Sequence, residues 1–400
     1  IKYTKMRNDT ITQFQEKMKL YKKETGRDYD TREKFEYFFE YSEKNKDVVV
    51  DVPPHLHIEK DKPWFMPNEK LDLLPLSGIS NSETIYCNEN GYFSKYLSDR
   101  YGFNNPDSEW DSEEIEYLLI GDSFGHGACV NRPNDIASVL RSTSEKNVLT
   151  LSYAGNGPLI EYATLKEYFP PNTKNIIWLY FQNDVNNLAK ELSSDILKKY
   201  FNDDNFIQNL KTKQAYIDDR LKNIVEYSYK KIKHSFENSK TTPFYKLQRN
   251  NKELEFIGII NTLKRDFIFS KFIRLHNIRE KGSKKIFNPV WKPLTVKLPP
   301  KKFKEILLKV KKFSKQNNSN LYFVYLEGFD TFEFDIDRSS YNKIKEIVQE
   351  IGIPFLDTNK LLFQNISDPK IFFPHGKPGH YNILGYKTLA EQIHLHIVND

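Results

Sequence analysis

The chain has 400 residues, of which 28% are charged and 38% hydrophobic, and a formal net charge of +6. This length and balance fit one large or two ordinary domains with a buried core, and they exclude a low-complexity or collagen-like chain. The sequence contains no apolar run of the roughly eighteen residues that a membrane-spanning helix needs, so none of it is expected to cross a bilayer.

The first 110 residues are predicted to form an N-terminal extension that is partly helical and partly β-rich. Residues 5–47 are polar and compatible with helix, with Gly26 as the one interruption by glycine. Residues 48–110 contain three consecutive valines, the pair Pro53-Pro54 and turn sequences such as Asn88-Glu89-Asn90-Gly91. Such a mixture is typical of short strands and loops.

From residue 111 the sequence alternates regularly between apolar strands and amphipathic helices. This βαβ order predicts a flavodoxin-like, doubly wound α/β domain over residues 111–400, with a parallel sheet covered on both faces. Strands are expected near 115–121, 147–152, 175–181, 321–325 and 353–356, and helices near 134–143, 158–169, 301–315, 340–351 and 382–397.

The alternation is interrupted by a basic, largely helical insertion at about residues 190–300. Between residues 190 and 312 roughly thirty Lys and Arg face about thirteen Asp and Glu. A basic surface could contact an anionic polysaccharide or another anionic surface through long-range attraction, and a solvated helical face is the alternative. Charge alone does not predict a nucleic-acid partner, and none is expected.

Two cysteines, Cys87 and Cys129, are too few for a disulfide scaffold and lack the spacing of metal ligands. We expect two buried thiols, with one disulfide as the alternative. No metal or organic cofactor is expected.

Four polar or glycine signals follow predicted strands or precede the last helix. Ser123 follows the first strand, Gly155 the second and Asn183 the third, while His380 lies before the final helix. Active sites of doubly wound sheets form at the carboxyl ends of the strands, so these residues are expected to meet.

These residue types match the needs of acyl transfer. Ser123 offers a nucleophilic hydroxyl, His380 a base, and the N–H groups of Ser123 and Gly155 with the Asn183 amide offer donors to an oxyanion. Asp122 and Asp184 adjoin two of them as supporting residues. Each has a structural alternative: a helix entry or cap for Ser123 and Asn183, a turn glycine for Gly155, and a surface histidine for His380. His126 lies close to the nucleophile in sequence; a side chain that faces solvent is expected, with a side chain that lines the pocket as the alternative.

With these blocks the sequence resembles the SGNH hydrolases, also called GDSL esterases. The matching blocks are Gly121-Asp122-Ser123-Phe124, Gly155, Asn183-Asp184, and His380 followed by Gly385-Tyr386. The resemblance implies Ser123 as nucleophile, His380 as base, and Ser123, Gly155 and Asn183 as the oxyanion hole. The chain is most similar to members that modify bacterial envelope polysaccharides, O-acetyltransferases and esterases with long lead-ins and insertions.

The chain departs from the family pattern at two places. Phe181 stands where the third block usually has Gly, and Lys377 and Pro378 stand where the acid that orients the histidine is usual. A Lys cannot accept a hydrogen bond from an imidazole. Three alternatives remain: a backbone carbonyl holds the ring, Asp357 or Asp368 does, or the enzyme is weak or inactive.

The sequence therefore predicts a serine-dependent ester hydrolase or O-acyltransferase that forms an acyl-serine. Its expected partner is a small ester or an acylated carbohydrate, with acetyl as the expected acyl group. The alternative is a catalytically degenerate SGNH-fold binding or assembly protein of the cell envelope. Because the chain starts at Ile1, an upstream signal or anchor is expected to have been removed. This start favours the bacterial periplasm or envelope over the cytoplasm.

Overall fold

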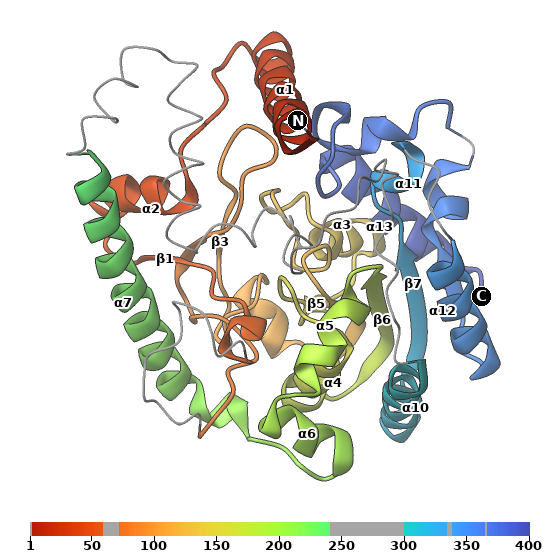
Figure 1. Cartoon of the computed structure of the whole chain (residues 1–400). Coiled ribbons are helices and arrows are strands. Elements are labelled where there is room, and N and C mark those ends of the chain that lie inside the picture. Colours follow the sequence, from red (N-terminus) through yellow and green to blue (C-terminus); the bar gives the residue numbers. More distant parts are fainter. Residues whose placement is uncertain (1, 59–71, 241–299, 334–337, 365) are drawn as a thin grey trace, which may run out of the picture.

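A parallel five-stranded sheet forms the centre of the computed structural model, which describes residues 2–58, 72–240, 300–333, 338–364 and 366–400 (Figure 1). The strand order is β5-β4-β6-β7-β8, and all four pairings are parallel. Numbered along the sheet region alone, this is the 2-1-3-4-5 order of flavodoxin-like folds. The predicted doubly wound α/β fold is confirmed. The strands are β4 (Ile115–Gly121), β5 (Val148–Thr150), β6 (Thr173–Phe181), β7 (Asn320–Leu326) and β8 (Phe355–Asp357).

Both faces of this sheet are buried, which explains why its strands are almost continuously apolar. Along β4, Leu118 and Ile120 belong to one hydrophobic cluster, and Tyr117 and Leu119 to a second cluster on the opposite face. The first cluster includes side chains of α4 (Pro158–Tyr168), α10 (Pro300–Gln316) and α12 (Ser339–Glu350). The second includes side chains of α3 (Ile136–Ser144) and α13 (Ile383–Val398).

The N-terminal extension is helical and β-rich, and it packs on the sheet domain. Strand β1 pairs in parallel with β2, and β2 pairs antiparallel with β3. Phe35 and Val50 of the extension share one hydrophobic cluster with Leu118 and Trp178 of the central sheet. One core therefore runs across the predicted boundary near residue 110. The elements are α1 (Lys2–Thr25), α2 (Lys34–Ser42), β1 (Val48–Val50), η1 (Pro54–Ile58), β2 (Glu83–Ile85), β3 (Lys95–Leu97) and η2 (Asp107–Asp111).

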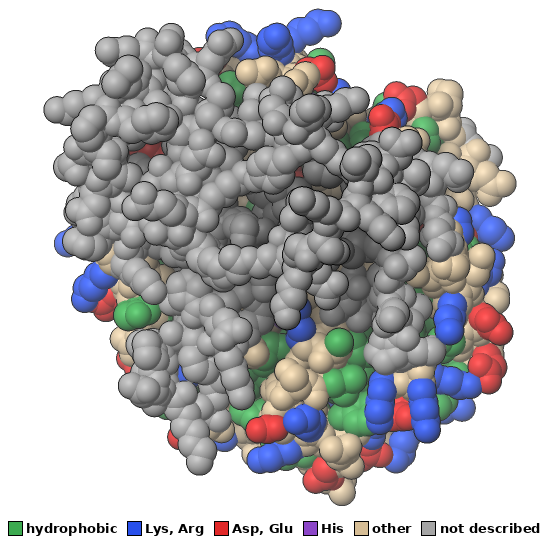
Figure 2. Space-filling model, in the orientation of Figure 1, with side chains coloured by type: hydrophobic (Ala, Val, Ile, Leu, Met, Phe, Trp, Pro, Cys, Tyr) green, Lys and Arg blue, Asp and Glu red, His purple; other side chains and the backbone are tan. Residues whose placement is uncertain are grey.

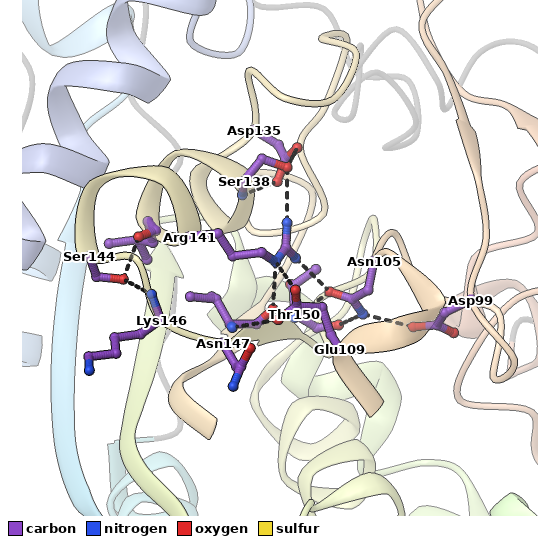
Figure 3. A network of polar contacts seen from close by, with 12 residues as sticks. Asp99, Asn105, Glu109, Asp135, Ser138, Arg141, Ser144, Lys146, Asn147 and Thr150 are labelled. Atoms are coloured by element: carbon purple, nitrogen blue, oxygen red, sulfur yellow. Dashed lines mark hydrogen bonds and ion pairs between the residues drawn. The ribbon is translucent and has the colours of Figure 1, made fainter. Parts of the chain in front are cut away.

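Side chains of the extension also cover β5, which lies at the edge of the central sheet (Figure 3). The Asn105 amide donates to the Thr150 carbonyl at 2.9 Å and accepts from the Thr150 N–H at 2.8 Å. The Glu109 carboxylate accepts from the Val148 N–H at 2.9 Å. From α3 of the sheet domain, Arg141 Nε donates to the Val148 carbonyl at 2.9 Å. An uncovered edge would expose unpaired backbone groups, so these contacts both close the sheet and fix the extension on it.

Helix α5 (Asp184–Glu191) ends where the predicted insertion begins, and the described part of the insertion contains α6 (Asp195–Asn202), η3 (Leu210–Lys213) and α7 (Gln214–Lys240). Residues 241–299 lie outside the described residues. Lysines near α10 alternate with acidic side chains on the face shown in Figure 2, and Lys309 and Lys312 both pair with Asp204. The remaining short elements are α11 (Asp330–Glu333), η4 (Asn359–Phe363), η5 (Pro369–Phe372) and η6 (Pro374–Gly376).

Cys87 and Cys129 form a disulfide, with their Cα atoms 4.9 Å apart. The expectation of two thiols is therefore wrong. The sequence could not reveal the pair because 42 residues separate the two cysteines, and only the fold brings them together. Among the described residues, no helix combines the length and the apolarity required for crossing a membrane.

Candidate active site

The turn after β4 presents Ser123 at the carboxyl edge of the sheet. Gly121 is required where β4 ends, because a Cβ there would lie 2.5 Å from the Leu179 carbonyl oxygen of neighbouring β6. Buried Asp122 accepts a hydrogen bond from the Phe124 N–H at 3.0 Å and so shapes the turn. Turns follow Ser123, and α3 begins only at Ile136. Ser123 is therefore not a helix cap.

His380 meets Ser123 across the end of the sheet. Its Nε2 lies 2.8 Å from Ser123 Oγ, while Asp122 Oδ2 lies 3.2 Å from the same hydroxyl. The imidazole also packs against the Phe124 ring at a centroid distance of 4.8 Å. Asn382, and not His380, caps α13 by accepting from the Gly385 N–H. The structure thus brings together the predicted nucleophile and base, 257 residues apart in sequence.

Glu89 lies beside the other imidazole nitrogen. Its Oε1 is 3.0 Å from His380 Nδ1, and its Oε2 accepts from the His380 backbone N–H at 2.6 Å. Burial alone would raise the pKa of Glu89, but the charge and hydrogen bonds of His380, with the charge of Lys17, lower it to about 2. An ionised carboxylate at Nδ1 directs the Nδ1 proton toward itself, so Nε2 is left to accept from the serine hydroxyl.

The two acids proposed from the sequence are not the ones that orient the ring. Asp357 accepts from the Tyr341 hydroxyl and from the Asn359 N–H, and Asp368 accepts from the Lys370 N–H as a helix cap. The Lys377 ammonium pairs with Glu16. The expectation that Asp357 or Asp368 contacts the His380 ring is wrong. The carboxylate at Nδ1 is that of Glu89, 291 residues before His380 in sequence.

Glu89 is carried by a hairpin that the sequence had marked only as a turn. We call residues 86–94, which connect β2 to β3, the hairpin arm. The Tyr86 N–H donates to the Ser94 carbonyl, and the Ser94 N–H to the Cys87 carbonyl, so the ladder continues beyond the strands. Asn88 Oδ1 accepts from the Gly91 N–H at 3.0 Å and closes the tip. Three polar residues and a glycine in a turn are ordinary, and no local signal distinguishes this carboxylate.

Gly155 is held in a conformation that favours glycine, with φ +72°. A Cβ at this position would lie 2.3 Å from the His55 ring. The His55 Nδ1 in turn is 3.3 Å from the Ala154 carbonyl oxygen. The steric reason for glycine is thus a neighbouring imidazole from η1, and the sequence did not predict this contact between His55 and the Gly155 loop.

His126 is fully buried, contrary to the expectation that it faces solvent. Its Nδ1 accepts from the Ala154 N–H at 3.3 Å, and its Nε2 lies 2.9 Å from the Tyr96 hydroxyl. Burial lowers the pKa of His126 to about 3, with a further contribution from the charge of Lys34. A neutral His126 therefore joins the Ser123 turn, the Gly155 loop and the extension.

Asn183 lies between β6 and α5 and makes no side-chain cap bond to the helix. It is buried, and its Oδ1 has no hydrogen-bond partner among the described residues. Asp184 Oδ2 accepts from the Phe181 N–H at 2.7 Å and closes the turn before the helix. Asp184 therefore stabilises the turn that carries Asn183, and Asn183 lacks the capping bond considered above.

Helix α5 connects the Asn183 turn to the Gly155 loop. Asn187 Nδ2 donates to the Gly155 carbonyl at 3.1 Å, and Glu191 accepts from the N–H groups of Gly157 at 2.7 Å and Leu159 at 3.0 Å. Burial raises the pKa of Glu191 to about 7, although those N–H bonds oppose the change. The two loops that would supply oxyanion donors are thus one connected unit.

Helix α1 lies against the loop that carries His380. Lys17 Nζ donates to the Pro378 carbonyl at 2.7 Å, and His375 Nδ1 is 2.8 Å from a Glu24 carboxylate oxygen. The Tyr21 ring lies where a Cβ on Gly91 of the hairpin arm would be. The first helix therefore touches both the loop that carries the base and the arm that carries the acid.

One group of potential metal ligands occurs in the described part of the chain. It consists of Glu89, Cys129 and His380, whose ligand atoms lie within 4.8 Å of one another. Cys129 is in the disulfide and has no thiolate to offer, and His380 Nδ1 faces Glu89. The arrangement fits an acid–base pair better than a metal centre.

No protein-family model matches the chain, and no curated protein matches it. Two solved structures are similar over most of the chain. One is a candidate lipolytic protein of the G-D-S-L family from Desulfitobacterium hafniense DCB-2, with 13% identity and a TM-score of 0.29, covering 70% of this chain and 98% of that one. The other is a carbohydrate esterase family 2 enzyme with a carbohydrate-binding domain from Corynascus thermopiles (Myceliophthora fergusii). It has 10% identity and a TM-score of 0.35, and covers 77% of this chain and 71% of that one. TM-scores this low do not support an inference about function.

Proposed function

We propose that the chain is a serine esterase of the SGNH type, in which Ser123, His380 and Glu89 act as a catalytic triad. The observation that carries the proposal is the continuous path from Ser123 Oγ to His380 Nε2 at 2.8 Å and from His380 Nδ1 to Glu89 Oε1 at 3.0 Å. A nucleophile, a base and an orienting acid in hydrogen-bond reach are the diagnostic arrangement for covalent catalysis.

In the proposed first step, His380 Nε2 takes the proton of the Ser123 hydroxyl as Oγ attacks the ester carbonyl carbon. The imidazolium that forms is stabilised by Glu89, which stays ionised. The N–H groups of Ser123 and Gly155 and the Asn183 amide donate to the carbonyl oxygen as it becomes an oxyanion. When the tetrahedral intermediate collapses, His380 returns the proton to the leaving alcohol, and an acyl-serine remains.

In the second step, water or a sugar hydroxyl attacks the acyl-serine with His380 again as base. Water gives an esterase, and a sugar hydroxyl gives an O-acyltransferase. The resemblance of the sequence blocks to envelope polysaccharide enzymes supports an acetylated carbohydrate as the substrate. Chromatography of products formed from an acetylated oligosaccharide, with and without an unacetylated acceptor, distinguishes the two outcomes.

The proposal is tested by Ser123→Ala on a chromogenic acetyl ester and by a fluorophosphonate probe. The expected result is loss of hydrolysis and of probe labelling in the variant, with unchanged melting temperature. Asp368→Asn is the matched control, because this residue only caps η5, and it should keep full activity. Full activity in Ser123→Ala would rule out the acyl-serine mechanism.

The rival proposal is a binding or assembly protein with a degenerate site. It rests on the absence of an acid just before His380 in the sequence, whereas the Glu89 carboxylate lies 3.0 Å from Nδ1. The geometry therefore favours the enzyme. A probe that fails to label Ser123 in folded protein would return the preference to the binding protein.

A further inference from the structure

The disulfide links two of the chain segments that carry residues of the proposed triad. Cys87 precedes Glu89 by two residues on the hairpin arm, and Cys129 follows Ser123 by six residues in the turns after β4. The bond therefore joins the segment that carries the acid to the segment that carries the nucleophile. A second contact runs in parallel: Asn90 Nδ2 donates to the Cys129 carbonyl at 2.8 Å.

The Tyr86 ring of the hairpin arm also contacts the nucleophile turn, 4.3 Å from the His126 ring. Strand β2 pairs with β1 as well as with β3, and the Tyr86–Ser94 backbone bond extends the ladder, so the base of the arm is held by the sheet of the extension, while Glu89 lies beyond these pairs. Tyr86 and Tyr96 form a small apolar cluster with Ala128 and Cys129, and Cys87 packs against it. The disulfide is the covalent link within this small cluster.

Cys129 occupies a backbone conformation that disfavours a side chain. Its φ is +62°, in the left-handed region that residues other than Gly seldom adopt. It is also buried, and its side chain is the one that reaches Cys87. A cysteine in this position is therefore explained by the bond that it makes.

Glu89 must be held to within a fraction of an ångström. It accepts from both the backbone N–H and Nδ1 of His380, and each contact sets the angle of the ring toward Ser123. A displacement of about 1 Å in such a site lowers the rate about a hundredfold.

We propose that the Cys87–Cys129 disulfide is the positioning element of the catalytic acid, so that its reduction uncouples Glu89 from His380 and lowers the esterase rate. This inference rests on the proposed function. A dithiol supplies two electrons and two protons: its thiolate attacks the half-buried Cys87 sulfur, Cys129 leaves as a thiolate, and the reagent ends as a cyclic disulfide. Cys87 and Cys129 become thiols, and a disulfide oxidant reverses the change. An oxidising compartment would keep the enzyme in its active form.

The experiment compares oxidised and dithiothreitol-reduced enzyme for the wild type and for Glu89→Gln. Thiol titration under native conditions counts the two released thiols, and circular dichroism confirms that the fold persists. Reduction of the wild type should lower kcat by about tenfold to a hundredfold with little change in KM. Reduction of Glu89→Gln should change kcat less than about twofold, because the acid through which the disulfide acts is already absent.

Two further measurements distinguish the loss of Glu89 positioning from a general loosening of the protein. The double variant Cys87→Ser/Cys129→Ser should match the reduced wild type and ignore dithiothreitol. The proton NMR signal of His380 Nδ1–H, identified by its loss in Glu89→Gln, should disappear on reduction, and this readout does not depend on esterase activity. An equal fractional loss in Glu89→Gln, or full activity and an unchanged signal after both thiols are released, would overturn the inference. Absence of hydrolysis and probe labelling in oxidised enzyme would instead count against the proposed function.

Discussion

The central sheet and the hairpin arm contribute to the same site in different ways. The sheet places Ser123, Gly155 and Asn183 at successive strand ends, as parallel topology requires. The hairpin arm reaches the site from the other end of the chain and adds Glu89, which lies 291 residues from His380 in sequence. Topology can therefore predict where strand ends meet, whereas a carboxylate that lies on an extension is identified only when the fold is known.

The largest loss of activity is expected at His380, the base that the hairpin arm and the nucleophile turn both contact. His380→Ala should lower kcat by a factor on the order of 10⁶, because the general base is lost from a unit that acts together. The matched control is His394→Ala, whose imidazole bonds the Tyr117 hydroxyl away from the triad. Esterase kinetics on the purified variants check both. Comparable losses in the two would mean that His380 is not the base.

Asn183→Ala should lower kcat by about 10²–10³ with little change in KM, as expected for a donor that acts mainly in the transition state. Asn183→Asp keeps the size of the side chain but places a negative charge near the developing oxyanion, so its loss should be at least as large. Steady-state kinetics with one acetyl ester measure both. A change confined to KM would show that Asn183 binds substrate without stabilising the oxyanion.

Because Glu191 joins the Gly155 and Asn183 loops, the free energy of unfolding should depend on the protonation of this residue. The folded pKa of Glu191 is raised to about 7 from an ordinary value of 4.5. The folded state therefore holds more protons between these values, and the free energy of unfolding should fall as pH rises from 4.5 through 7, by at most about 3 kcal/mol.

Glu191→Gln should flatten this part of the curve, because its side chain does not titrate. Denaturant unfolding at several pH values measures both proteins. Parallel curves for wild type and variant would show that Glu191 is not the group responsible.

The smallest expected effect concerns the attachment of the extension to the edge of the sheet. Asn105→Ala removes the amide that bonds the Thr150 N–H and carbonyl, so the free energy of unfolding should fall by about 1–3 kcal/mol. Folded variant should keep its kcat, since Asn105 lies outside the triad. A large loss of kcat at unchanged stability would mean that this edge transmits position to Glu89.

Much of the fold and part of the site could be predicted from the sequence. Nearly continuous apolar segments such as 115–121 and 175–181 predicted strands that the structure contains, since parallel strands buried on both faces are apolar along their length. Ser123 and His380 were identified from motifs, and the structure places them in contact. Glu89 and the disulfide were missed because both depend on contacts between distant segments, and a turn such as Asn88-Glu89-Asn90-Gly91 has an ordinary composition.

The central claim is that the hairpin arm supplies the acid of the triad, and Glu89→Gln tests it most directly. The measurement is kcat/KM for this variant beside Asp357→Asn and Asp368→Asn, each checked for folding. We predict a loss of up to about 10⁴ for Glu89→Gln, the size of the loss when the orienting acid of a serine triad is replaced by its amide, and a change of less than about threefold for the other two. Full activity in Glu89→Gln together with a large loss in Asp357→Asn or Asp368→Asn would contradict the account.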